Sequence, residues 1–125
     1  MKQASSEVVR KAEEYYDSSD ADSFYNTVWG GEDIHVGIYH STSESIYDAS
    51  RRTVEQMAEK LNTWPSGTQV LDIGAGYGGS GRYLAREKHY EVSCLNLSEV
   101  QNERNRRLTE EANLSGAVQV VYGNF

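Results

Sequence analysis

The sequence predicts an α/β fold built on a parallel sheet, of which this chain carries three strands. Short aliphatic runs at 69–73, 90–95 and 117–122 alternate with helical stretches. Four glycines, all within residues 74–79, follow directly after the first of these runs. Alternating strands and helices are typical of parallel strands joined by right-handed crossovers, which predicts the spatial order 3-2-1.

The first 64 residues are expected to form a helical segment ahead of the sheet. Apolar residues at helical spacing predict a helix from Ser6 to Tyr16. A short aromatic helix capped by Asp20 is expected over 21–28, followed by a glycine-punctuated loop over 29–39. Residues 45–61 have the apolar spacing of a long amphipathic helix. A change in composition at 64–67 divides the chain into the parts 1–64 and 65–125.

The second part is expected to be the first half of a doubly wound domain. Its predicted helices run from 79 to 87 and from Ser98 to 112, and Gln101 is the expected capping-box partner of Ser98. The first strand would lie at an open, apolar edge of the sheet. We therefore expect the remainder of the domain, or a partner chain, to cover that strand.

Charge and composition limit the classes of partner. The chain has 12 basic and 19 acidic residues and a net charge of −7, which argues against nucleic acid or an anionic membrane as partner. No apolar stretch approaches the ~20 residues of a membrane-spanning helix. A single cysteine favours a reducing, cytoplasmic location, and without a Cys/His cluster no metal site is expected.

The glycine turn after the first strand suits a nucleotide, and its neighbours indicate which one. On its own the turn is compatible with a nicotinamide or flavin dinucleotide. Asp72, two residues before Gly74, would repel a diphosphate but would favour an ammonium or sulfonium group. Asn96, after the second strand, can bond two ribose hydroxyls. A ligand with an amino acid at one end and a nucleoside at the other fits both positions, as S-adenosylmethionine does.

Three segments carry a resemblance to a known family. Asp72-x-Gly74-x-Gly76-x-Gly78 resembles motif I of the class I S-adenosylmethionine-dependent methyltransferases. The segment from Tyr25 to Tyr39 and the segment 94–105 are similar to the sarcosine/dimethylglycine N-methyltransferases, which make glycine betaine. The resemblance spans roughly residues 15–125 and the front half of that family's domain. It implies a partial Rossmann-like methyltransferase core with a helical N-terminal lid.

The resemblance also implies roles for individual residues. Asp72 would hold the methionyl amino group, Asn96 the ribose, and Leu97 and Asn124 the adenine. The implied cofactor-binding residues are Asp72, Gly74, Ala75, Gly76, Asn96, Leu97, Gln101, Asn124, Phe125 and His35. The implied cofactor is S-adenosyl-L-methionine, and the implied partner is a small amino-acid methyl acceptor, sarcosine or dimethylglycine.

The same family carries an aromatic lid, to which Tyr25, Trp29 and Tyr39 correspond. Aromatic faces attract cations, and both a sulfonium cofactor and a quaternary ammonium product are cations. His35 is expected to be a hydrogen-bonding residue of this lid, and no residue is assigned to catalysis. A satellite hydrophobic cluster remains an equally good interpretation of these aromatic residues.

Three other functions stay open at this point. One is a class I methyltransferase that acts on a lipid, a sterol or tocopherol-like compound, or phosphoethanolamine. The second is a fragment that binds the cofactor without catalysis. The third, a nicotinamide-dependent oxidoreductase, is disfavoured by Asp72 and Asn96.

Overall fold

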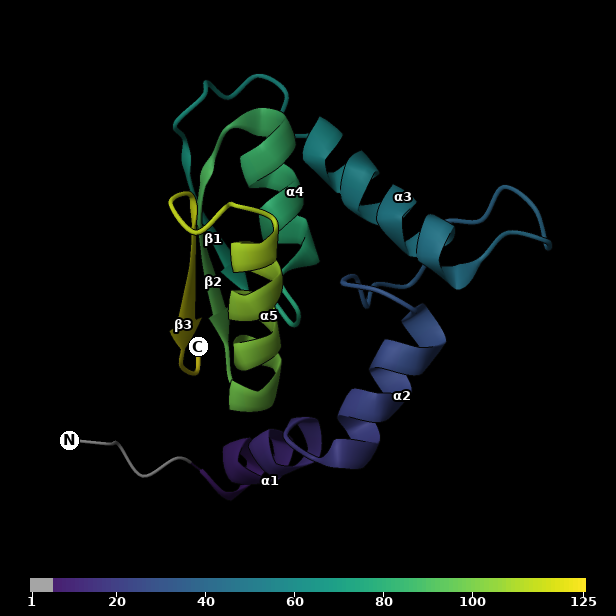
Figure 1. The fold of residues 1–125 in the computed structure, drawn as a ribbon, viewed down its shortest axis with the longest axis vertical. Helices are drawn as coiled ribbons and strands as arrows, with labels where there is room; N and C mark the ends of the chain where they lie inside the picture. Colours follow the sequence, from purple (N-terminus) through teal and green to yellow (C-terminus); the bar gives the residue numbers. More distant parts are fainter. Residues whose placement is uncertain (1–5) are drawn as a thin grey trace.

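The sheet and two of the helices form two layers (Figure 1). The computed structural model describes residues 6–125. Its strands, β1 (Gln69–Ile73), β2 (Glu91–Asn96) and β3 (Val118–Tyr122), are parallel and lie in the order β1-β2-β3. This confirms the predicted order. The helices α4 (Gly79–Lys88) and α5 (Glu99–Glu111) lie against one face of the sheet.

The hydrophobic core lies between that face and the helices. Val92 and Cys94 of β2 and Val118 of β3 are buried there with Leu84 of α4. Ala58 belongs to the same core, so α3 (Ile46–Glu59) packs against the sheet domain although it precedes residue 64. The core thus includes a residue from before position 64, and the division of the chain into the parts 1–64 and 65–125 remains a prediction.

The opposite face of the sheet is apolar and exposed. Ile73, Leu95 and Val121 are register partners across the three strands and form one row on this face. Leu71, Ile73 and Val121 are 59%, 51% and 42% exposed. Among residues 6–125, no helix covers this row in the way that α4 and α5 cover the other face.

Serine side chains cap the N-termini of all the described helices except α4, which begins at the glycine turn. Ser6, Ser45 and Ser98 accept hydrogen bonds from the first turns of α1 (Glu7–Tyr16), α3 and α5, as their places in the sequence suggest. The expected cap Asp20 is wrong, because Ser18 accepts from the amide of Ala21 at 3.2 Å and starts α2 (Ser19–Trp29) earlier. Asp20 lies in the first turn instead, where its charge favours the helix dipole.

The helix α1 is attached to the carboxyl end of the sheet. The Asp17 carboxylate accepts hydrogen bonds from the Ser98 hydroxyl at 2.5 Å and from the Val100 amide at 3.3 Å. The Tyr122 hydroxyl, at the end of β3, donates to Glu13. These contacts place α1 beside the ends of β2 and β3. Within residues 6–125, no helix has the length and apolar character needed to cross a bilayer.

Candidate functional site

The turn between β1 and α4 presents bare backbone at the carboxyl end of the sheet. Gly74 and Gly76 have φ values of +74° and +56°, the left-handed region that favours glycine. The amides of Gly74 and Ala75 donate to the carbonyl of Leu95 at 2.8 and 3.1 Å, which fixes the turn to β2. A Cβ placed on Gly74 would meet nothing within 4 Å. The turn therefore leaves open space in front of Gly74.

That space is part of a cavity of about 370 Å³ between α1 and the ends of the strands. It unites several of the residues expected from sequence to bind the cofactor, and residues of α1 and Ile34, from the loop after α2, line its other side. The sequence-predicted residues that line it are Gly74, Gly76, Asn96, Leu97, Gln101, Asn124 and Phe125. The other lining residues are Val8, Val9, Ala12, Tyr16, Ile34 and Ser98.

The polar groups of this cavity fit a nucleoside-bearing ligand. The Asn96 amide donates to Gln101 Oε1 at 3.0 Å, and Gln101 Nε2 is buried without a hydrogen-bond partner. An unpaired buried donor costs about 1–3 kcal/mol, which an acceptor on a ligand would relieve. Gly74 supplies a cradle that a Cβ would fill. S-adenosylmethionine, with its nucleoside and amino-acid ends, matches these two features.

Asp72 and His35 lie in a neighbouring, smaller cavity of about 230 Å³, together with Ser80. His35 Nε2 and the Ser80 hydroxyl are 2.8 Å apart. Burial raises the pKa of the Asp72 carboxyl, and the charge of His35 acts in the opposite direction. Ala75 lines neither cavity. The cofactor roles of these three residues remain predictions.

The aromatic residues of the expected lid do not share one place. The rings of Tyr25 and Trp29 lie 5.6 Å apart in α2, and Tyr25 stacks on Tyr16, which lines the larger cavity. The Trp29 indole donates to the carbonyl of His35 at 2.8 Å. Tyr39 is 47% exposed and lines a separate surface hollow. Tyr25 and Trp29 therefore pack behind Tyr16 without lining the cavity, whereas Tyr39 lies apart.

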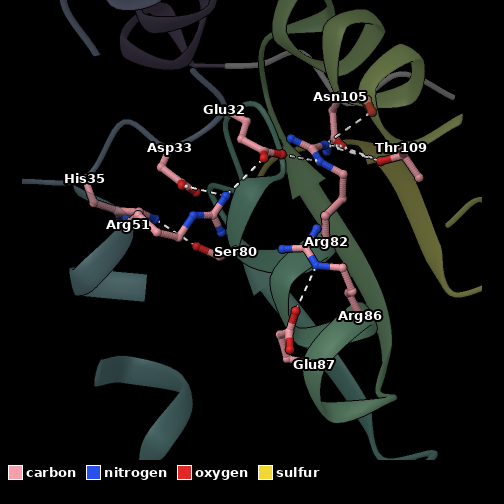
Figure 2. Close-up of polar contacts among 10 residues, drawn as sticks. All are labelled: Glu32, Asp33, His35, Arg51, Ser80, Arg82, Arg86, Glu87, Asn105 and Thr109. Atoms are coloured by element: carbon pink, nitrogen blue, oxygen red, sulfur yellow. Dashed lines mark hydrogen bonds and ion pairs between the residues drawn. The ribbon is translucent and has the colours of Figure 1, made fainter. Parts of the chain in front are cut away.

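Sequence reasoning missed a buried ionic cluster behind the glycine turn (Figure 2). Arg82 is 1% exposed, and its Nε lies 2.7 Å from the carboxylate of Glu32. Arg51 lies within 3.1 Å of both Glu32 and Asp33. These partners are far apart in the sequence, so no local pattern connects them. The one signal in the sequence was the pair Gly78-Gly79. These two glycines do not face the cavity, and the space beside them is filled by Asn105 and Asp33.

The cavity at the carboxyl ends of parallel strands, with its glycine turn, is the nucleotide-binding arrangement of a Rossmann-like fold. Residues 3–125 match the family described as mycolic acid cyclopropane synthetase. The chain belongs to this family of S-adenosylmethionine-dependent methyltransferases.

Similar proteins agree with this assignment. A sarcosine/dimethylglycine N-methyltransferase from Aphanothece halophytica is 53% identical over 118 residues, which are 94% of this chain. The chain spans 43% of that relative's length.

Two solved structures share the fold. A candidate sarcosine dimethylglycine methyltransferase from Galdieria sulphuraria has a TM-score of 0.79 at 43% identity and covers 88% of this chain and 42% of its own. A methyltransferase from Thiobacillus denitrificans, in complex with S-adenosyl-L-homocysteine, has a TM-score of 0.54 at 25% identity. It covers 58% of this chain and 29% of its own.

Proposed function

We propose that this chain supplies the cofactor-binding part of an N-methyltransferase that converts sarcosine and/or dimethylglycine toward glycine betaine. The observation that carries the proposal is the cavity in front of Gly74, which is lined by seven of the ten residues expected to hold S-adenosylmethionine. The acceptor comes from the name of the relative that is 53% identical. Because the chain spans 43% of that relative, the acceptor and the activity of the whole protein are part of the proposal.

Each end of the cavity has a separate role in this proposal. Asn96 and Gln101 would bind the ribose hydroxyls, and Leu97, Asn124 and Phe125 would surround the adenine. The bare turn at Gly74, Ala75 and Gly76 would lie under the methionyl part, with Asp72 and His35 near its amino group. When bound, S-adenosylmethionine supplies an electrophilic methyl group on a sulfonium.

The residues around the cavity would orient the ligands and exclude water. Val8, Val9 and Ala12 of α1 give one wall an apolar surface. Tyr25 and Trp29, which pack behind Tyr16, would favour a cationic cofactor and product through their ring faces. Proximity and orientation in such an enclosed site supply much of the rate of a transfer between two bound molecules.

The proposal extends to the setting of the enzyme. We place it in the cytoplasm, because its one cysteine, Cys94, is unpaired and buried. Its partners would be a small amino acid and the remainder of its own domain, or a partner chain, against β1. Nucleic acid and membrane surfaces are not among its partners in this proposal, because the chain carries a net charge of −7.

Calorimetric titration with S-adenosylhomocysteine and with NAD tests the cofactor. We expect one molecule of S-adenosylhomocysteine to bind and NAD not to bind. Ala12→Trp should weaken this binding by filling the cavity from α1, whereas Lys11→Trp, on the same helix but outside the cavity, should not. Tight binding of NAD alone would contradict the proposal.

A methyl-transfer assay of the natural-length protein tests the acceptor. We expect labelled methyl groups to pass to sarcosine and dimethylglycine. Transfer only to phosphoethanolamine or a sterol would keep the cofactor assignment and overturn the acceptor. Binding without transfer to any acceptor would support a protein that holds the cofactor without catalysis.

A further inference from the structure

The segment 30–38 crosses the glycine turn and forms part of the cavity wall. The Ile34 side chain lies 3.2 Å from the position that a Cβ on Gly76 would occupy, and Ile34 lines the larger cavity. The next residue, His35, contacts Ser80 and lines the smaller one. The segment has no regular secondary structure. Its position over the turn therefore depends on contacts with the helices, among them the Ile38 amide, which donates to the Ala49 carbonyl of α3 at 3.0 Å, and side-chain contacts.

Glu32 supplies the central contact by bridging two helices (Figure 2). One carboxylate oxygen lies 3.0 Å from the guanidinium of Arg51 on α3, and the other lies 2.7 Å from that of Arg82 on α4. Asp33 adds a second contact, with its Oδ2 3.1 Å from Arg51. One nitrogen of the guanidinium, Arg51 Nη2, thus contacts two successive residues of the segment.

The cluster is anchored behind the turn by α5. Arg82 donates to the Asn105 side chain at 2.8 Å. The Asn105 amide occupies the place where a Cβ on Gly78 would lie, and the Asp33 carboxylate occupies the same place at Gly79. These two glycines therefore make room for the ionic cluster, whereas Gly74 and Gly76 face the cavity.

The burial of these four charges indicates what the cluster does. The side chains of Asp33 and Arg82 are each 1% exposed, and those of Arg51 and Glu32 are 15% and 27% exposed. Buried ion pairs seldom add net stability, because desolvation offsets their attraction, but they can select one arrangement of the chain. Here the selected arrangement is the one that holds Ile34 on the turn.

We infer that Glu32, Arg51 and Arg82 form an ionic latch that positions Ile34 over the glycine turn and so sets the affinity for the cofactor. The three are positioning residues, since none of them lines the cavity. The inference rests on the proposed function for the identity of the ligand. The latch itself is a property of the ligand-free protein and can be measured without any ligand.

Arg51→Lys and Glu32→Gln test the latch in the natural-length protein. The lysine keeps the charge but has a shorter side chain and lacks the planar guanidinium whose Nη2 lies beside both acids. The glutamine keeps the shape but loses the charge. We expect each to raise the Kd for S-adenosylhomocysteine about tenfold, equal to about 1.4 kcal/mol. The double variant should be little weaker than either single variant, because both break one unit. Arg82→Lys is avoided because Arg82 is 1% exposed and the variant risks misfolding.

The matched control is Arg86→Lys, one turn further along α4. Arg86 pairs with Glu87 at 2.9 Å, and both side chains are nearly half exposed. Figure 2 shows this pair outside the cluster. We expect its Kd to equal that of the unmodified protein.

Fluorine NMR gives a readout that does not depend on the ligand. Trp29 donates to the carbonyl of His35, so 5-fluorotryptophan at Trp29 reports on the position of the segment. Its resonance, assigned by its loss in Trp29→Phe, should shift or broaden in both latch variants and stay in place in Arg86→Lys.

An unchanged resonance in folded Arg51→Lys and Glu32→Gln would overturn the latch, and so would an unchanged Kd. A shifted resonance in a protein that binds no S-adenosylhomocysteine would instead support the latch as a structural device and reject the proposed cofactor. The two failures are therefore distinguishable.

Discussion

Asp72 is a carboxylate kept in a place that disfavours its charge. It follows Leu71 at the carboxyl end of β1 and lies in the smaller cavity near His35. Burial raises the pKa of its carboxyl group, so ionised Asp72 is less stable in the folded chain than in the unfolded chain. A charge in this position is consistent with a cationic ligand group as its partner.

Asp72→Asn should therefore separate binding from stability. We expect the Kd for S-adenosylhomocysteine to rise roughly 10- to 100-fold, since a hydrogen bond to a charged group contributes about 1.5–3 kcal/mol. The ligand-free protein should not melt at a lower temperature, because the variant removes a buried charge. Titration calorimetry and thermal denaturation at pH 7 measure the two effects, and Asp20→Asn in the first turn of α2 is the exposed control.

The raised pKa of Asp72 also predicts a pH dependence. As pH falls, the carboxyl group gains a proton at a higher pH than an ordinary aspartate with a pKa of 3.8. Affinity that depends on its charge should decline over that same higher range, and Asp72→Asn should lack this decline. The relative stability that protonated Asp72 contributes is present at low pH and is lost as pH rises through the raised pKa. The same pH profile in both proteins would contradict the assigned role.

Cys94 lies in an environment that lowers the reactivity of its thiol. It is fully buried in the core, and burial raises the pKa of its thiol to about 11. At pH 8 the thiol is therefore protonated and should react with iodoacetamide about a hundredfold more slowly than an ordinary cysteine. Peptide mass spectrometry of native and denatured protein measures the two rates. Fast native labelling would show that the core opens.

At the scale of the elements, Ser98 connects α5 to α1. Its hydroxyl accepts from the Gln101 amide to cap α5 and donates to Asp17, which ends α1. Ser98→Ala should cost about 1 kcal/mol of unfolding free energy through the lost cap. It should also loosen α1 from the cavity, which hydrogen exchange of α1 would detect.

Ser6→Ala is the matched change at the start of α1. Ser6 accepts from the Val9 amide in the same way, but α1 contains no buried residue. Fraying of α1 exposes little core, so the global unfolding free energy should change by less than in Ser98→Ala. Equal losses in the two variants would show that α1 unfolds together with the sheet.

The sequence predicted the elements well where local signals agreed. Strand β1 has its predicted bounds, and Ser98 caps α5 as expected. Asp20 was wrongly chosen over Ser18 because both are good capping residues and only backbone geometry separates them. Local patterns were thus sufficient for periodic segments and insufficient for their exact ends.

The candidate site was less predictable because its parts meet only in three dimensions. Gly74, Asn96 and Asn124 could be grouped in advance, since the carboxyl ends of parallel strands share one edge of a sheet. The burial of Arg82 could not be predicted, because its partner Glu32 is 50 residues away in a loop. Charged residues are normally exposed, and only the folded arrangement shows which are paired.

At the scale of the whole molecule, the uncovered face of the sheet is the dominant feature. Leu71, Ile73 and Val121 are exposed there, opposite the helical layer. When residues 1–125 are produced by themselves, we expect association that increases with concentration. Sedimentation velocity measures it, and Ile73→Lys should reduce it. Val8→Lys, at a residue that is 76% exposed on α1, should have a smaller effect.

The Asp17–Ser98 contact has a consequence for the order in which the protein is made. Its two residues are 81 positions apart, and at ~5–20 residues per second a ribosome needs several seconds to pass from one to the other. During that time α1 has no sheet to hold it. A ligand in the cavity can therefore stabilise only chains whose synthesis has passed β3, and it offers no protection to shorter nascent ones.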